Sequence, residues 1–244
     1  MLFTDLVWWQ YGLVLLVCTH LTVLSVTIYL HRCATHGALQ LRAPLSHFFR
    51  FWSWFTTGMI TREWVAVHRK HHAKVDREED PHSPWWYGLL RVLFFGVFLY
   101  RRAALDPKVI EDYGYGTPDD GIERQVYSRH ATAGVLLYLF TLVLLFGALW
   151  GPVFWFTNVA WIPFWAAGVV NGLGHSFGYR NHDTPDKSRN IFPISIFLCG
   201  EALHNNHHER QGSAKFSHRW FECDFGYFYI FAFKLVGLAH SVRK

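Results

Sequence analysis

Eight of the sixteen histidines lie in three short motifs, and these motifs are the part of the sequence best suited to chemistry. On a helix, residues three and four apart share a face, so an HxxHH motif presents three imidazoles within about one turn. The two adjacent histidines of such a motif diverge slightly, which allows neighbouring rings to reach two different metal ions. The motifs are HxxxxH (His31, His36), HxxHH (His68, His71, His72) and a second HxxHH (His204, His207, His208).

The HxxxxH spacing needs a different backbone. Five residues along an α-helix amount to about 140° past one full turn. We therefore expect His31 and His36 to converge only if the helix ends or bends there. Seven of the eight histidines outside the motifs are expected to be ordinary surface or hydrogen-bonded core residues: His20, His47, His82, His130, His182, His218 and His240.

The number and type of these side chains favour two iron ions. Eight imidazoles are too many for one zinc ion, which takes about four ligands, and imidazole suits iron. The sequence lacks the cysteine set of an iron–sulfur cluster. A histidine-rich di-iron site in a membrane indicates oxygen activation on an apolar substrate. An unactivated methylene has no acidic proton and no electrophilic carbon, so side chains cannot react with it by acid–base or nucleophilic catalysis. The cofactor must therefore supply one-electron and oxygen chemistry.

Three apolar runs are long enough to position these motifs at a bilayer. Residues 6–30 are nearly uncharged, and a helix needs about 20 such residues to cross. Residues 132–149 and 153–170 form a predicted membrane hairpin, with a tight turn at Gly151 and Pro152. Residues 45–60 and 85–100 are apolar but carry arginine, so we interpret them as in-plane amphipathic helices. We predict an all-α integral membrane protein with about three transmembrane helices, in-plane helices and a cytoplasmic cap rich in histidine.

Two arguments support this arrangement. All three motifs can meet on one side of the membrane only if an even number of membrane crossings separates them. The hairpin supplies two crossings between the second and third motifs, so residues 45–60, between the first and second, must not cross. Basic residues mark the cytoplasmic side of a membrane protein. Because they gather between the first span and the hairpin, we expect the N-terminus outside and the active site on the cytoplasmic face. These basic residues are Arg32, Arg42, Arg62, Arg69, Lys70, Lys74 and Arg77.

The composition agrees with a largely apolar protein that has one polar face. Apolar residues make up 51% of the chain, charged residues 17%, and the formal net charge is +5. A modest positive excess can attract anionic headgroups or an acidic partner. No basic run is interleaved with base-stacking aromatics in a polar segment, so we predict no nucleic-acid binding.

Beyond the motifs, further stretches resemble the membrane fatty acid desaturases, specifically the stearoyl/acyl-CoA desaturase-like branch in its bacterial form. The three motifs occur in that family's order, and Asp80-Pro81-His82-Ser83 follows the second. The stretch from Asn171 through His175 to Arg180 also matches, as do Gly200-Glu201 before the third motif and Gly212, Phe216 and Trp220 after it. The resemblance covers nearly the whole chain, so residues 1–244 are expected to form a single membrane fatty acid desaturase domain.

The resemblance implies an activity and a ligand set. The activity is oxygen-dependent introduction of a double bond into a fatty acyl chain, with reduction of O2 to water. The family's ninth ligand corresponds to His175, and Asn171 would act through a water molecule. One iron would take His31, His36, His68, His72 and His207, and the other would take His71, His175, His204 and His208. Arg101 and Arg102 match a basic pair that faces phosphates in the family.

The sequence also departs from the animal members of that family. They have two spans before the first motif, whereas only 30 residues precede His31 here. They carry an Arg-Asp pair that helps hold CoA just before the second motif, where this chain has Ala66 and Val67. The acyl substrate is therefore expected as either acyl-CoA or a phospholipid-bound chain.

Electrons must come from a partner. The sequence has no CxxC, no ferredoxin cysteine set, no fused cytochrome b5 signature and no glycine-rich nucleotide fingerprint. We expect a separate ferredoxin-, rubredoxin- or cytochrome b5-like donor with its reductase. It would dock near Lys70, Lys74 and Arg77, or near Arg210 and Lys215.

Two other functions are alternatives to desaturation. A membrane di-iron lipid or alkane hydroxylase would use a similar site, but would insert oxygen instead of forming a double bond. A non-catalytic metal-binding or transport protein would need ionisable residues inside its spans. The predicted hairpin has almost none.

Overall fold

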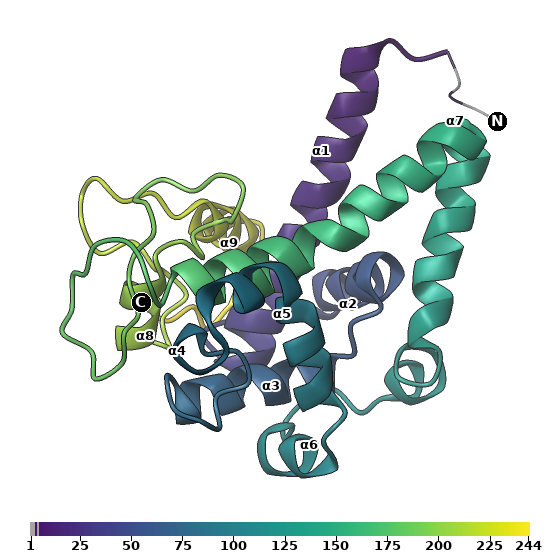
Figure 1. The fold of residues 1–244 in the computed structure, drawn as a ribbon. Helices are drawn as coiled ribbons and strands as arrows, with labels where there is room; N and C mark the ends of the chain where they lie inside the picture. The colour runs from purple at the N-terminus through teal and green to yellow at the C-terminus, as the bar shows by residue number, and fades with distance from the viewer. Residues whose placement is uncertain (1–2, 4) are drawn as a thin grey trace.

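Two long apolar helices form the frame of the molecule (Figure 1). The computed structural model describes residues 3 and 5–244. In it α1 (Trp8–Leu24) continues directly into a π-helix, η1 (Ser25–Thr35). Together they make 28 helical residues, apolar and long enough to cross a membrane. The helix starts slightly later than the predicted span of residues 6–30 and runs further, so that His31 lies on the helix itself.

The second long element is the predicted hairpin, but its turn is elsewhere. It consists of α7 (Ala131–Ile162), which runs into the π-helix η3 (Pro163–Leu173). The chain reverses at Gly147, whose backbone (φ 84°, ψ 173°) is open almost only to glycine. The predicted turn at Gly151 and Pro152 is therefore wrong. Gly151 lies in the second arm, where a Cβ atom would come within 2.7 Å of the Val143 backbone in the first arm.

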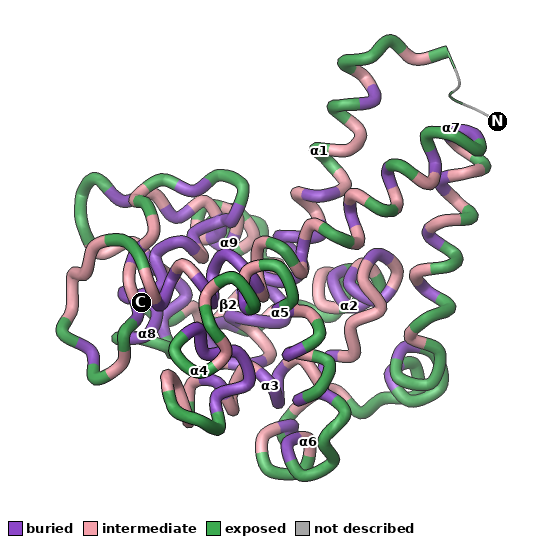
Figure 2. Tube along the Cα trace, in the orientation of Figure 1, coloured by how far each residue is buried: buried purple, intermediate pink, exposed green. Residues whose placement is uncertain are grey.

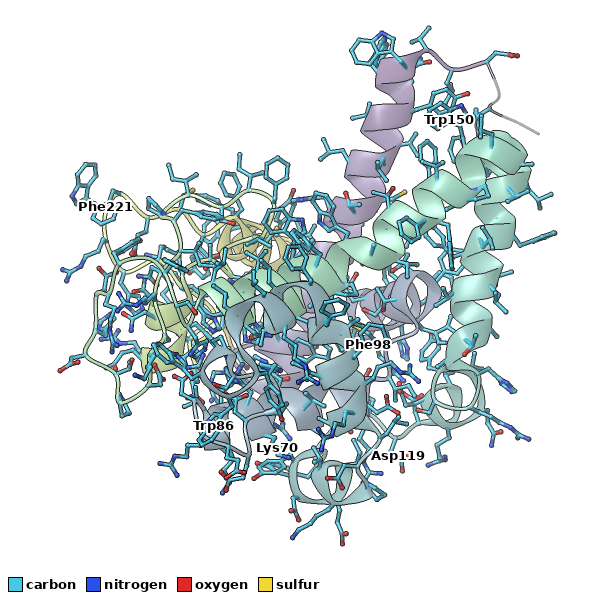
Figure 3. All side chains as sticks on the ribbon, viewed as in Figure 1. Lys70, Trp86, Phe98, Asp119, Trp150 and Phe221 are labelled. Carbon is cyan, nitrogen blue, oxygen red and sulfur yellow. The ribbon has the colours of Figure 1, made fainter. Side chains whose placement is uncertain are left out.

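The hairpin tip lies beside the N-terminal end of α1. The rings of Tyr11 and Trp150 stack with centroids 4.8 Å apart. Figure 3 places Trp150 at this end of the molecule, with Lys70 and Asp119 at the opposite end. Exposed apolar side chains, such as Leu149 and Phe156, surround the hairpin. Figure 2 shows the contrast between these exposed arms and the buried residues around the centre of the molecule.

Two shorter helices correspond to the segments interpreted as lying in the membrane plane. Residues 45–60 form α2 (Ala43–Thr57), and residues 85–100 form α4 (Pro84–Tyr87) and α5 (Leu89–Ala104), separated at Gly88. Helices of 15 and 16 residues span about 22–24 Å, less than the hydrocarbon core of a bilayer. Figure 1 shows α2 almost end-on while α1 lies in the plane of the picture, so the two cross steeply.

Close packing fixes α5 against η3. A Cβ atom on Gly168 would lie 2.3 Å from the backbone oxygen of Leu93, and one on Gly96 would lie 2.8 Å from that of Ala167. Small residues at such contacts let two helix backbones approach closely. This contact sets the position of the arginine-bearing end of α5.

The remaining elements are short. The strands β1 and β2 pair antiparallel, tying the end of the chain to the segment after His36. These elements are α3 (Thr61–Lys74), α6 (Pro107–Tyr113), η2 (Glu123–Tyr127), α8 (His204–Glu209), α9 (Phe225–Leu235), β1 (Gln40–Leu41) and β2 (Ala239–His240).

Candidate metal centre

The second histidine motif lies on α3, whose inner face is apolar. Val65, Ala66 and Val67 are almost fully buried, and they fix which side of the helix faces the molecule. His68 and His72 are one turn apart and approach each other, with Nε2 atoms separated by 3.0 Å. His71 lies on the neighbouring face and points to a different group of histidines.

The first motif converges because the helix widens. In η1 the backbone forms i→i+5 hydrogen bonds, the pattern of a π-helix, and His36 N donates to the carbonyl of His31 over 3.2 Å. Residue i+5 is thereby brought over residue i. The two rings have centroids 4.9 Å apart. The helix continues to Thr35, so a π-helical segment, together with the helix end at His36, supplies the convergence that an α-helix would not.

The third motif and His175 complete the site from the other half of the chain. His204, His207 and His208 lie on the short helix α8 and are buried. His175 follows η3 after Gly174, where a Cβ atom would lie 2.9 Å from the ring of His204. Nine histidines from four segments therefore meet in one place.

These nine histidines form two groups. Within each group the candidate ligand atoms all lie within 4.8 Å of one another. Each HxxHH motif contributes to both groups, as the divergence of its adjacent histidines requires. The first group is His31, His36, His68, His72 and His207, and the second is His71, His175, His204 and His208.

Four buried or nearly buried carboxylates orient the rings. In each pair the histidine Nδ1 lies 2.9–3.1 Å from a carboxylate oxygen, which leaves Nε2 facing the centre of the group. A carboxylate in this position fixes the tautomer and makes the ring a better metal ligand. The pairs are His31 with Glu201, His71 with Asp80, His175 with Asp76, and His208 with Asp186.

The electrostatics keep the carboxylate of Asp80 charged. Burial by itself would raise the pKa of Asp80, but the charge and hydrogen bond of His71 outweigh it and hold the pKa below its ordinary value. The same ion pair anchors the loop after α3, because Asp80 also accepts hydrogen bonds from the backbone N–H groups of Asp76 and His82.

The imidazoles are suited to bind metal. Burial lowers the pKa of six of them well below the ordinary value, so they are neutral at pH 7 and keep a lone pair. These six are His36, His68, His72, His204, His207 and His208. Among the described residues, the inward Nε2 atoms of His71 and His208 have no hydrogen-bond partner.

The spacing of the nitrogens also fits a shared ion. Neighbouring Nε2 atoms in the first group lie 3.0–3.2 Å apart. Two nitrogens bound at about 2.1 Å and at right angles to each other would be about 3.0 Å apart. A set of four or five imidazoles with carboxylate support suits a borderline divalent metal such as iron.

His82 is a residue of this region that the sequence interpretation missed. It was expected to be an ordinary surface or hydrogen-bonded core histidine. It is instead buried with its ring 4.6 Å from that of His71, and within the described chain neither ring nitrogen has a hydrogen-bond partner. The signal in the sequence was its position in Asp80-Pro81-His82-Ser83, directly after the carboxylate that holds His71.

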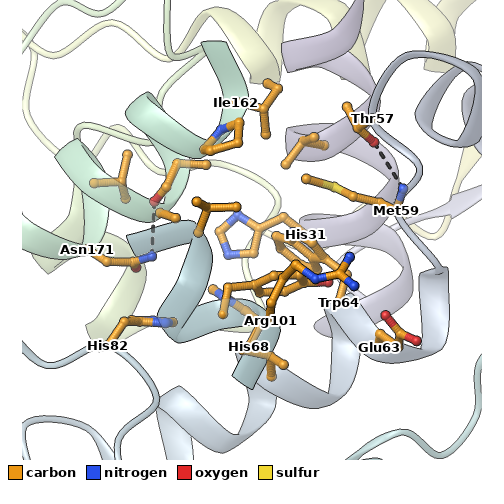
Figure 4. Close-up of a pocket in the computed structure, with 18 of the residues that line it drawn as sticks. His31, Thr57, Met59, Glu63, Trp64, His68, His82, Arg101, Ile162 and Asn171 are labelled. Carbon is orange, nitrogen blue, oxygen red and sulfur yellow. Dashed lines mark hydrogen bonds between the residues drawn. The ribbon is translucent and has the colours of Figure 1, made fainter. Parts of the chain in front are cut away.

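A largely apolar cavity of about 220 Å³ reaches the histidines (Figure 4). His31, His68 and His204 line its polar wall, and Met59 and Ile162 contribute to its apolar wall. Substrate-sized sites in proteins commonly combine an apolar lining with a few polar groups. The arrangement can hold an apolar chain against the two histidine groups.

The remaining predicted site residues differ in whether they line this cavity. Asn171 lines it, and its Nδ2 donates to the carbonyl of Ala166, which leaves the amide oxygen for water. Both arginines are exposed, but Arg101 lines the cavity, as Glu63 does, whereas Arg102 does not. The two arginines therefore do not take equivalent positions.

Comparison with known proteins gives one consistent family. The family described as fatty acid desaturase matches residues 6–222. Delta-9 acyl-lipid desaturase 1 of Arabidopsis thaliana is 29% identical over 234 residues, which cover 90% of this chain and 71% of that protein. The sn-1 stearoyl-lipid 9-desaturase of Anabaena variabilis is 29% identical, covering 97% and 85%. Icosanoyl-CoA 5-desaturase of Limnanthes douglasii is 28% identical, covering 91% and 61%.

Proposed function

The chain belongs to the fatty acid desaturase family, and from that premise we propose that it introduces a double bond into a fatty acyl chain at a histidine-held di-iron centre. The observation that carries this proposal is the pair of buried histidine groups beside an apolar cavity. Two such groups suit two iron ions, and the cavity suits a hydrocarbon chain.

We assign the ligands from the same geometry. His31, His36, His68, His72 and His207 would hold one iron, and His71, His175, His204 and His208 the other, with Asn171 acting through water. When bound, the iron pair supplies the one-electron and oxygen chemistry that side chains lack. Glu201, Asp80, Asp76 and Asp186 hold the ligand rings in place. The apolar wall positions the acyl chain and keeps bulk water away from it.

The reaction balances only with external electrons. A saturated –CH2–CH2– segment, O2, two electrons and two protons give –CH=CH– and two water molecules. Oxygen reduction takes four electrons, of which the substrate supplies two. A separate carrier protein, with its reductase, would supply the other two.

The headgroup is proposed at the mouth of the cavity. Some relatives are named for acyl-lipid substrates and another for an acyl-CoA. Acyl-CoA and phospholipids carry phosphate, which an arginine recognises by charge-assisted hydrogen bonds. Arg101, on the cavity lining, is the proposed contact, and acyl-CoA and phospholipid both fit this chemistry.

Expression in a host that lacks this activity tests the proposal. Mass spectrometry of the host lipids should reveal a new double bond, and the purified protein should contain two irons per chain. The variant His207→Ala should lose the product, whereas His240→Ala, which changes a histidine outside both groups, should keep it. A product with an inserted oxygen would favour the hydroxylase alternative instead.

A further inference from the structure

A concave basic surface lies directly beyond the third histidine motif, and the acyl site does not use it. Its volume is about 400 Å³. We call it the basic pocket and define it by six residues of its lining: His182, Arg210, Lys215, His218, Arg219 and Lys244.

The basic pocket has an excess of positive charge. Its lining contains four basic side chains and no Asp or Glu, and the buried Glu222 beside it accepts hydrogen bonds from the backbone N–H groups of His218 and Arg219. Within the part of the chain that the structure describes, none of these four forms an ion pair. Burial, followed by the neighbouring His182 and Arg210, lowers the pKa of His218, and the opposing charge of Glu222 does not outweigh them. Such a surface complements a negatively charged partner.

The basic pocket is also the outer side of the metal centre. Phe216 lies in the chain between two residues of the pocket lining, Lys215 and Ser217, and its buried ring has its centroid 4.7 Å from that of His207. On the floor of the pocket, His182 N–H donates to Asn205 over 2.9 Å, and Asn205 stands within the third motif. One layer of side chains therefore separates the surface from the histidine groups.

We propose that the basic pocket is the docking site of an acidic one-electron carrier protein, and that electrons reach the centre past Phe216 and His207. This inference rests on the proposed function, in which each double bond requires two electrons from outside. Two successive carrier molecules, each oxidised by one electron, supply them. Both protons come from solvent, and the oxygen leaves as water.

The alternative surface on α3 and the loop after it is weaker on the same criteria. Lys74 pairs with Glu79 over 3.3 Å, whereas none of the four cations of the basic pocket forms an ion pair within the described residues. An anionic lipid headgroup would also suit a basic surface. Lipid binding, however, would not require the contact between Phe216 and His207. This contact offers a path for electrons from the surface to the metal centre, and it therefore favours an electron carrier.

Binding of two acidic carriers tests the proposal: a plant-type [2Fe–2S] ferredoxin and the soluble haem domain of a cytochrome b5. The iron-loaded protein should bind at least one of them, more weakly as salt rises. The charge reversal Lys215→Glu with Arg219→Glu should raise the Kd at low salt by about ten-fold or more and flatten the salt dependence. The matched reversal Lys70→Glu with Arg77→Glu should leave the Kd within about two-fold of the original.

Several outcomes would overturn the docking site. The proposal is wrong if neither carrier binds, or if both charge reversals change the Kd equally. It is also wrong if Lys215→Glu with Arg219→Glu leaves the Kd unchanged. A loss of co-purified phosphatidylglycerol from that variant, with carrier binding intact, would make the pocket a lipid site. Iron content and thermal unfolding equal to those of the unmodified protein exclude a folding defect. Because binding is measured without turnover, a failure to make double bonds would count against the proposed function and not against docking.

Discussion

At the scale of single residues, spacing revealed the histidines but not the groups that orient them. The HxxHH and HxxxxH patterns are local, and local geometry on a helix can be read from sequence. Glu201 and Asp186 instead reach their histidines through tertiary contacts between distant segments. Helix spacing alone therefore does not predict which acid orients which ring. The burial of His82 beside His71 is likewise a tertiary feature, although its place directly after Asp80 was a local signal.

The orienting role of Asp76 gives a first prediction. Asp76→Asn keeps the shape of the side chain and tolerates the positive φ of 57° at this position, but it removes the negative charge that faces His175 Nδ1. Loss of such a partner typically costs about 10–100-fold in metal affinity or activity. Iron titration of the apoprotein should show weaker binding of one of the two ions. Asp119→Asn, in an exposed ion pair with Arg124, is the control and should bind both ions normally.

The unequal positions of the two arginines on α5 give a second prediction. Arg101→Ala should raise the apparent KM for a phosphate-bearing acyl substrate more than it lowers kcat, because the contact is remote from the reacting carbon. Arg102→Ala, at an exposed position outside the cavity, is the matched control and should change KM little. Steady-state kinetics with each variant measures both parameters. Equal effects of the two variants would mean that the pair anchors α5 to the membrane surface.

At the scale of elements, hydropathy located the helices and missed their irregularities. The first apolar run, the hairpin and α2 all lie close to their predicted ranges. The π-helical winding of η1 was not foreseen, because it is stabilised by what surrounds it: Arg32 is fully buried and paired with Asp224. The hairpin turn was assigned to Gly151 and Pro152 because proline is a strong turn signal, yet Pro152 lies inside the helical second arm and the chain reverses earlier, at Gly147.

The hairpin turn gives a third prediction. Gly147→Ala places a Cβ atom on a backbone with φ 84° and ψ 173°, a conformation that costs a non-glycine residue about 1–3 kcal/mol. Thermal unfolding in detergent should show a lower Tm. The control is Gly12→Ala in α1, where a Cβ atom would meet nothing within 4 Å and alanine favours the helix. An unchanged Tm in Gly147→Ala would place the turn elsewhere.

At the scale of the whole molecule, the charge argument for orientation is weaker than the sequence suggested. Arg32 was counted among the cytoplasmic basic residues, but it is fully buried and paired with Asp224. Arg69 donates to backbone carbonyls, including that of Thr35, and stacks on Tyr115. Both therefore serve the fold. The orientation then depends on the exposed or half-buried remainder: Arg42, Arg62, Lys70, Lys74 and Arg77.

The fourth prediction tests this orientation and the number of crossings. If α1 and both arms of the hairpin cross, the hairpin tip lies outside the cell and the loop after α3 lies in the cytoplasm. A cysteine at Leu149, which is 73% exposed, should react with a membrane-impermeant maleimide in intact cells. A cysteine at Arg77 should react only after permeabilisation. The native cysteines are buried or half-buried, and the unmodified protein measures their background. Labelling of the Arg77 position in intact cells would reverse the topology, since the histidine groups and the basic pocket lie on the same side as this loop.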